Sequence, residues 1–273
     1  SDEFTGSIGV VTVNLPQIGY LAQDEDDFYR RLDHVMDLAK DSLVTKRKVV
    51  TQLNNNGLFP YTARYLKNFK NHFATIGLCG MNECCLNFLG CDIVDEKGHK
   101  FAEEVLIHMR DRLSQYQVET GDLFNLEATP AESTSYRLAK HDRDQFPGII
   151  SSGDADPYYT NSSQLPVGYT SDLFDALDRQ EPLQTKYTGG TVFHVFLGES
   201  ITDYKACRDL VKSIAYNYRI PYFSISPTFS ICPIHGFIAG QEFECPTCKS
   251  ERTETLKHKI SDLEEEKTQI ERR

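Results

Sequence analysis

Residues 8–15 read IGVVTVNL, and Pro16 follows them directly. Most of these residues are β-branched, and β-branched side chains fit a strand better than a helix. The run is almost entirely apolar, as in strands that are covered on both faces. The sequence therefore predicts a buried β-strand that ends at Pro16.

A long amphipathic helix is predicted after this strand. Acidic residues fill positions 24–27, where the dipole of a helix favours negative charge in its first turn. Apolar residues then recur at intervals of three and four, the spacing of one helical face. These apolar residues are Phe28, Leu32, Val35, Met36, Ala39 and Leu43.

The rest of the chain alternates between the two kinds of element. Strands are predicted at 73–78, 123–128, 191–197 and 222–225, and helices at 61–69, 82–89, 101–116 and 203–218. Pro130 is predicted to be the first residue of a further helix, and residues 147–170 to form a long ordered loop. About five strands alternating with helices predict an α/β fold with a parallel sheet or part of an α/β barrel. The chemistry of such folds lies at the carboxyl ends of the strands.

Composition limits the class of protein. The 273 residues include 29 Lys and Arg against 40 Asp and Glu, a net charge of −11, which excludes a generally basic coat for nucleic acid. No apolar run is long enough to span a membrane, and residues 1–25 show no export signal. The clustered cysteines favour reduced thiols and metal ligation over disulfides. We therefore expect a soluble, cytoplasmic protein with neither a nucleic-acid nor a membrane partner.

The strongest local motif is a set of metal ligands near the carboxyl end. Cys232 and His235 form one Cys-x2-His pair, and Cys245 and Cys248 form a Cys-x2-Cys pair after nine intervening residues. Two such pairs can close a tetrahedron around zinc, and four protein ligands leave no open position for water. The spacing predicts a structural zinc ribbon; the alternative is a set of buried free thiols.

A second motif is the stretch FNLEATPAESTSY at 124–136, which is predicted to run from a strand into a helix. Free backbone N–H groups at the start of a helix, together with hydroxyl groups, can bind phosphate without a basic residue. Ordinary helix capping is the commoner explanation of the same residues. Cys79, between Gly77 and Gly80, is a candidate redox or nucleophilic thiol, although a buried cysteine that only packs is the commoner case.

The chain is predicted to divide into three parts. These are a partial α/β barrel at 1–226, a zinc ribbon at 227–248 and a charged amphipathic helical tail at 249–273. In the tail, Leu256, Ile260 and Leu263 share one helical stripe. The tail is either a solvated helix or a short coil that binds a partner.

Several blocks of the sequence, in order, resemble one family, the anaerobic (class III) ribonucleoside-triphosphate reductases of the glycyl radical enzymes. The blocks are GSIGVVTVNLPQIGY (6–20), NGLFPYTARYL (56–66), TIGLCGMNE (75–83), FNLEATPAESTSYRLAKHD (124–142), YYTNSSQLPVGYT (158–170), TKYTGGTVFHVFLGE (185–199) and the zinc motif. The resemblance implies the carboxy-terminal half of a ten-stranded α/β barrel. It also implies a reaction, the removal of the ribose 2′-hydroxyl from ribonucleoside triphosphates by glycyl and thiyl radical chemistry.

The resemblance also implies site residues and partners. The loop formed by Thr129, Pro130, Ala131, Glu132, Ser133 and Thr134 resembles the substrate phosphate site. Ser7 stands where formate-using members carry asparagine, which favours a thioredoxin-like reductant, with Cys79 as a possible redox partner. The expected partners are the ribonucleoside triphosphate, a radical-SAM activating enzyme, the reductant, and either the remainder of the reductase or a second copy.

Two features of the family are absent from this sequence. Members carry a thiyl-forming cysteine shortly before the IGVVT strand and a radical glycine after the zinc motif, whereas here the first cysteine is Cys79 and the last glycine is Gly240. We therefore expect the glycyl radical in the full enzyme but not in this chain, which should be inactive alone. The alternative function is a non-catalytic zinc-ribbon interaction protein on a degenerate barrel half.

Overall fold

The computed structural model describes residues 4–170, 172–197, 201, 203–227, 229–239, 242 and 244–271. These residues form two compact units. Unit 1 extends to Phe193 and includes Ala215–Phe223, and unit 2 comprises His194–Ile214 and the residues from Ser224 onward. The three-part division predicted from the sequence stays a prediction.

A three-stranded parallel sheet forms the centre of unit 1. Its strands are β1 (Gly6–Asn14), β2 (His72–Cys79) and β3 (Phe124–Glu127), in that order across the sheet. In register, Asn14 pairs with Cys79, and Gly77 pairs with Glu127. The predicted strands and their parallel arrangement are therefore confirmed, and the carboxyl ends of all three strands lie along one edge.

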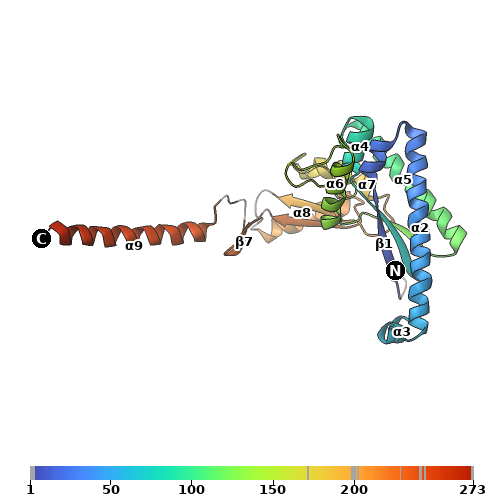
Figure 1. The fold of residues 1–273 in the computed structure, drawn as a ribbon, viewed down its shortest axis with the longest axis horizontal. Helices are drawn as coiled ribbons and strands as arrows, with labels where there is room; N and C mark the ends of the chain where they lie inside the picture. The colour runs from blue at the N-terminus through green and yellow to red at the C-terminus, as the bar shows by residue number, and fades with distance from the viewer. Residues whose placement is uncertain are drawn as a thin grey trace. The chain divides into compact units, whose positions relative to one another are not determined.

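Helices connect the strands, as expected for parallel neighbours. Their bounds are α1 Leu15–Leu21, α2 Glu25–Asn55, α3 Pro60–Leu66, α4 Met81–Leu89, α5 Glu96–Thr120, α6 Glu132–Gln145 and α7 Leu173–Gln184. Figure 1 shows α2 running alongside β1. The Asp24 carboxylate caps α2 by accepting the backbone N–H of Asp27 at 2.8 Å, so the predicted start of this helix is confirmed.

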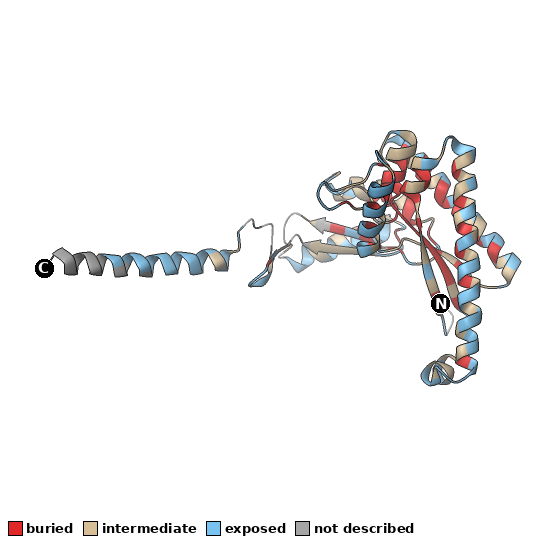
Figure 2. Cartoon of the chain, in the orientation of Figure 1, coloured by how far each residue is buried: buried red, intermediate tan, exposed pale blue. Residues whose placement is uncertain are grey.

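One face of the sheet is apolar and covered by helices. Alternate strand residues point to the same face, and Val13, Ile76 and Leu126 join the main core with Phe28 and Leu106 from the helices. Figure 2 shows this buried layer along the strands and the inner sides of α2 and α5. The hydrophobic effect of burying this face holds the sheet and the two long helices together.

The opposite face of the same strands is polar. Thr12, Asn14, Thr75, Asn125 and Glu127 alternate with the core residues and so point away from the helices. The last of them on each outer strand, Asn14 and Glu127, lie at the edge where the carboxyl ends of the strands meet. This face therefore carries the hydroxyl, amide and carboxylate groups that the sheet can offer to a ligand.

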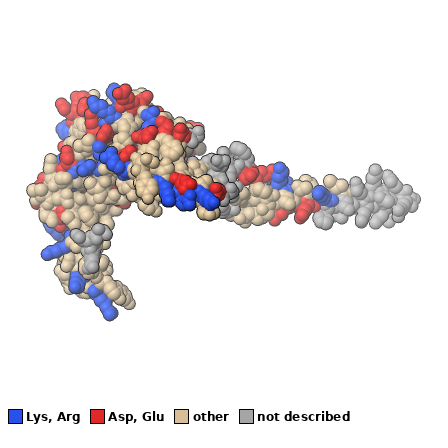
Figure 3. Space-filling model, turned by 180° about the vertical axis from the view of Figure 1, so that it is seen from behind, with Lys and Arg blue, Asp and Glu red and all other residues tan. Residues whose placement is uncertain are grey.

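Charge is unevenly distributed in unit 1. Residues 42–82 contain six Lys and Arg and no Asp or Glu, although the whole chain carries a net charge of −11. On the side drawn in Figure 3, basic side chains prevail around α3, and acidic ones are frequent at the opposite end of the unit. The acidic character inferred from composition is therefore not shared by the α3 end.

Unit 2 contains most of each remaining element. Strands β4 (Phe193–Leu197) and β5 (Phe223–Pro227) pair, and α8 (Tyr204–Asn217) lies between them in the sequence. An antiparallel hairpin of β6 (Phe229–Cys232) and β7 (Gly236–Ala239) precedes α9 (Pro246–Glu271). The strand count predicted for the α/β part, β1–β5, and the helical tail are confirmed. Within the described residues, no helix combines the length and apolarity needed to cross a bilayer.

One sequence prediction is wrong, and two helices were not predicted. Helix α6 begins at Glu132, so Pro130 lies two residues before the helix and is not its first residue. Helix α1 was not predicted, because Pro16 suggested only the end of a strand, whereas proline is also favoured in the first turn of a helix. Helix α7 was missed as well; Pro182 interrupts its pattern.

Candidate functional site

The residues of the predicted phosphate loop follow β3 directly. Thr129 lies partly buried after the strand, and its Oγ1 atom is buried with no hydrogen-bond partner among the described residues. This hydroxyl lies directly over Gly77 of the neighbouring strand, where a Cβ atom would overlap it. The missing side chain at Gly77 thus gives the loop the space to approach β2 closely.

The start of α6 leaves several backbone donors free. Ala131, which precedes the helix, has no side-chain group that could cap it, and the first helical bond runs from the Ser135 N–H to the Ala131 carbonyl at 2.6 Å. Within the described part of the chain, no acceptor is bound by the N–H groups of Glu132, Ser133 or Thr134. Free N–H groups at a helix start attract anions, so the local geometry can bind a phosphate group.

Cys79, the last residue of β2, is a buried thiol. Its Sγ donates toward the Thr160 carbonyl at 3.8 Å, and burial, with a smaller contribution from the Glu83 carboxylate, raises the pKa of the thiol to about 12. The thiol is therefore neutral at ordinary pH. Cys79 lies at the same edge of the sheet as Asn14 and packs with Ala131 of the phosphate loop.

Ser7 is not brought together with the phosphate loop. It lies near the amino end of β1, opposite Phe73, and its Oγ contacts the Gly9 carbonyl at 3.3 Å and the Thr75 hydroxyl at 3.5 Å. Asn14 lies seven positions further along β1, which corresponds to about 23 Å along an extended strand. The structure thus places Thr129–Thr134 and Cys79 at one end of the sheet and Ser7 toward the other.

Two buried carboxylates, Asp142 and Glu83, lie at this edge, and the sequence did not predict their contacts. Asp142 on α6 accepts hydrogen bonds from Asn14 Nδ2 at 2.7 Å, Tyr159 O–H at 2.9 Å and Gln17 Nε2 at 3.2 Å. Burial, followed by the neighbouring Asp142, raises the pKa of the Tyr159 phenol. No spacing in the sequence signals these contacts, because the partners come from three separate segments.

The second of these carboxylates belongs to Glu83, in the first turn of α4. It is fully buried and accepts hydrogen bonds from the Thr160 backbone, the Thr160 hydroxyl and the Ser152 hydroxyl at 2.6–2.9 Å. A third carboxylate, Glu127 at the end of β3, has a raised pKa because it is partly buried. Glu83 and Glu127 both lie near the carboxyl ends of the strands.

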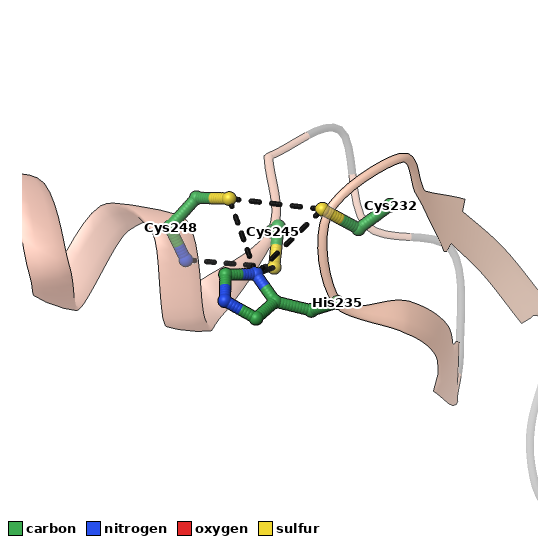
Figure 4. Close-up of side chains that lie close together, drawn as sticks. All are labelled: Cys232, His235, Cys245 and Cys248. Atoms are coloured by element: carbon green, nitrogen blue, oxygen red, sulfur yellow. Dashed lines mark hydrogen bonds between the residues drawn. The ribbon is translucent and has the colours of Figure 1, made fainter.

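The four predicted metal ligands come together in unit 2. Cys232 ends β6, His235 lies in the turn before β7, and Cys245 and Cys248 lie at the start of α9. All four ligand atoms lie within 4.8 Å of one another and could hold one metal ion. In Figure 4 the three sulfur atoms surround the Nδ1 side of the imidazole ring.

The distances within this cluster are short and nearly equal. The Nδ1 atom of His235 lies 3.8 Å from the Cys232 sulfur, 3.5 Å from the Cys245 sulfur and 3.3 Å from the Cys248 sulfur. Backbone N–H groups, first that of His235, lower the pKa of the Cys232 thiol, and the Cys248 N–H does the same for Cys245. These N–H groups favour the thiolate forms that bind metal ions.

The other imidazole nitrogen of His235 contacts an acid. Its Nε2 atom lies 3.3 Å from the Glu251 carboxylate, one turn along α9. Metal-binding histidines commonly donate their second N–H to a carboxylate, which fixes the ring orientation. The sequence analysis did not identify Glu251.

Comparisons with known proteins find one family model and several relatives that are similar to this chain. A family model described as anaerobic ribonucleoside-triphosphate reductase matches residues 1–259. The chain is 30% identical over 270 residues to the anaerobic ribonucleoside-triphosphate reductase of Haemophilus influenzae, covering 89% of this chain and 37% of that protein. The corresponding protein of Enterobacteria phage T4 is 27% identical over 245 residues, with 83% of this chain and 38% of that protein covered.

Solved structures give the same result. The anaerobic ribonucleotide reductase of Thermotoga maritima with MES in the active site superposes with a TM-score of 0.75 and 28% identity, over 91% of this chain and 41% of that chain. The same enzyme in complex with dATP and CTP gives a TM-score of 0.74 and 28% identity, again over 91% and 41%. The chain thus spans about two fifths of the length of the relatives that it matches.

Proposed function

The chain belongs to the anaerobic ribonucleoside-triphosphate reductase family, and from this premise we propose that it is the carboxy-terminal barrel part of such a reductase. The proposed enzyme converts ribonucleoside triphosphates to deoxyribonucleotides by glycyl and thiyl radical chemistry. The observation that carries the proposal is the family match over residues 1–259, which includes both the α/β part and the metal cluster.

We propose that the loop Thr129–Thr134 binds the triphosphate of the substrate. Three free N–H groups at the start of α6, the hydroxyls of Ser133 and Thr134, and the position at the carboxyl end of β3 support this role. The loop can bind phosphate without a basic side chain, because the start of the helix itself carries partial positive charge.

Titration with CTP tests this site. The double variant Ser133→Ala/Thr134→Ala removes both hydroxyls, and we expect its affinity for CTP to fall about tenfold, the effect of losing one to two hydrogen bonds to a charged group. Ser42→Ala/Thr45→Ala, on the exposed side of α2, is the matched control and should bind like the original chain. Equal, measurable affinity in the Ser133/Thr134 variant would exclude this loop as the site.

We propose that the reductant is a thioredoxin-like protein and that Cys79 of this chain is its redox partner. The high pKa of the Cys79 thiol means that it would act as a neutral thiol, which is the form that can give up a hydrogen atom. The role of Ser7 in excluding formate is proposed from the family resemblance alone. A radical-SAM activating enzyme and the remaining parts of the reductase, or a second copy, complete the proposed assembly.

We further propose that the metal ion is a structural Zn²⁺. Zn–S bonds of about 2.3 Å and Zn–N bonds of about 2.1 Å in a tetrahedron place sulfur atoms about 3.8 Å apart and sulfur and nitrogen about 3.6 Å apart. The Cys232 and Cys248 sulfurs are 3.6 Å apart, and the sulfur–nitrogen distances are 3.3–3.8 Å. Cys232, His235, Cys245 and Cys248 would fill all four positions, so the ion would stabilise the fold and activate no water.

The alternative of a non-catalytic zinc-ribbon protein is not favoured. That function needs only the metal cluster and the tail, whereas the family match covers residues 1–259, which include β1 and the phosphate loop. The eight cysteines form no disulfide with one another in the structure. Free thiols persist in a reducing compartment, which supports the proposed cytoplasmic location.

A further inference from the structure

The loop between α6 and α7 continues the sheet edge at the end of β2. Cys79 and Asn161 face each other in an antiparallel bridge. The Gly80 N–H donates to the Thr160 carbonyl at 2.8 Å, and the Met81 N–H donates to the Ser162 carbonyl at 3.0 Å. This part of the loop is therefore held by backbone hydrogen bonds against the carboxyl end of a core strand.

Glu83 also fixes this segment. Its buried carboxylate binds Thr160 through both the backbone N–H and the hydroxyl, and it binds Ser152 through the hydroxyl. Within the described residues, no Lys, Arg or His forms an ion pair with Glu83. A buried carboxylate without a cation depends on its hydrogen bonds, so the Thr160 backbone is held firmly at this point.

Asn161, the next residue, links this fixed segment to the phosphate loop. Its side-chain Oδ1 accepts the backbone N–H of Ala131 at 3.2 Å. The Ala131 carbonyl is bound by the Ser135 N–H, so both backbone groups of Ala131 have partners. The conformation of the residue that precedes α6 is thus set by an amide from a segment thirty positions later in the chain.

We propose that Asn161 is a positioning residue for the phosphate loop: it holds Ala131 so that the free N–H groups of Glu132–Thr134 point to one place. Asn161 does not itself need to touch the ligand. The inference rests on the proposed function only for the identity of that ligand, a nucleoside triphosphate.

Hydrogen exchange tests the positioning without any ligand. In the full chain, the peptide covering residues 128–135 contains the Ala131 amide, and its exchange can be followed by mass spectrometry. Asn161→Ala removes the acceptor, and we expect protection of that amide to fall roughly tenfold. Asn161→Asp keeps an acceptor oxygen and should retain the protection within about twofold, since a carboxylate oxygen accepts the same bond.

A matched control comes from the opposite end of unit 1. Asn68 also uses its Oδ1 to accept a backbone N–H, that of Lys70 at 3.0 Å, so Asn68→Ala removes the same kind of bond far from the loop. It should leave the 128–135 peptide unchanged. Unchanged protection in Asn161→Ala, or equal loss in Asn161→Asp, would overturn the inference.

Binding of CTP provides the second measurement. If Asn161 positions the loop, the dissociation constant for CTP should rise about five- to tenfold in Asn161→Ala and stay unchanged in Asn68→Ala. An unchanged or tighter affinity in Asn161→Ala would overturn the inference, since the freed Ala131 N–H would then serve the ligand better than the positioned loop. If the original chain binds no CTP, the proposed substrate site fails, and the exchange experiment still decides the role of Asn161.

Discussion

Asn14, the last residue of β1, donates its side-chain N–H to the buried carboxylate of Asp142 on α6 at 2.7 Å. The two residues are 128 positions apart in the sequence. The same carboxylate accepts the Tyr159 hydroxyl and the Gln17 side chain, so it joins the end of β1, α1, α6 and the long loop after α6. Asp142 therefore fixes the helix whose start forms the proposed phosphate site.

Replacing this carboxylate should destabilise unit 1. In Asp142→Asn one acceptor oxygen becomes an NH₂ donor, which leaves at least one of the three donors unpaired in a buried place. We expect a loss of about 2–3 kcal/mol in the free energy of unfolding, measured by urea denaturation. Asp144→Asn, exposed on the same helix, is the control and should change stability by less than about 0.5 kcal/mol. Equal stability of the two variants would contradict this role of Asp142.

Much of this fold could be predicted from local sequence patterns. The contacts between residues far apart in the sequence could not. The helix after Asp24 was predictable because its apolar residues recur at helical spacing from Phe28 to Leu43, and strand β2 because it is a short, largely apolar run. The metal cluster was predictable because its ligands form two close pairs. The contacts of Glu83 with Thr160 and of Asp142 with Asn14 join residues 77 and 128 positions apart, and no local spacing encodes them.

Loss of one cluster ligand should release the metal ion. Cys245→Ser removes one of three thiolates, and we expect metal content, measured by elemental analysis of the purified chain, to fall from about one Zn²⁺ per chain to below half. Cys207→Ser alters a cysteine of α8 outside the cluster and should keep its metal. Full zinc content in Cys245→Ser would mean that this sulfur is not a ligand.

The buried thiol of Cys79 should make stability depend on alkaline pH. Its pKa is raised from 9.0 to about 12 by burial, so the folded state favours the neutral thiol more than the unfolded state does. The resulting stabilisation is fully present below pH 9 and declines as the pH rises toward 12. We expect the free energy of unfolding to fall less steeply across this window in Cys79→Ala than in Cys207→Ala. Parallel curves for the two variants would show that Cys79 does not contribute.

The close approach of Thr129 to Gly77 should appear as an interaction between two substitutions. Gly77→Ala adds a Cβ that overlaps Thr129 Oγ1 and lies 3.1 Å from the Glu127 carbonyl, so we expect it to destabilise the chain by about 1–3 kcal/mol. Thr129→Ala removes the overlapping hydroxyl and should cost much less alone, because that hydroxyl has no partner. The double variant should then be more stable than the sum of the single effects predicts, by about 1 kcal/mol or more in urea denaturation. Strict additivity would mean that the Thr129 hydroxyl does not lie over Gly77, and the proposed shape of the phosphate loop would have to be abandoned.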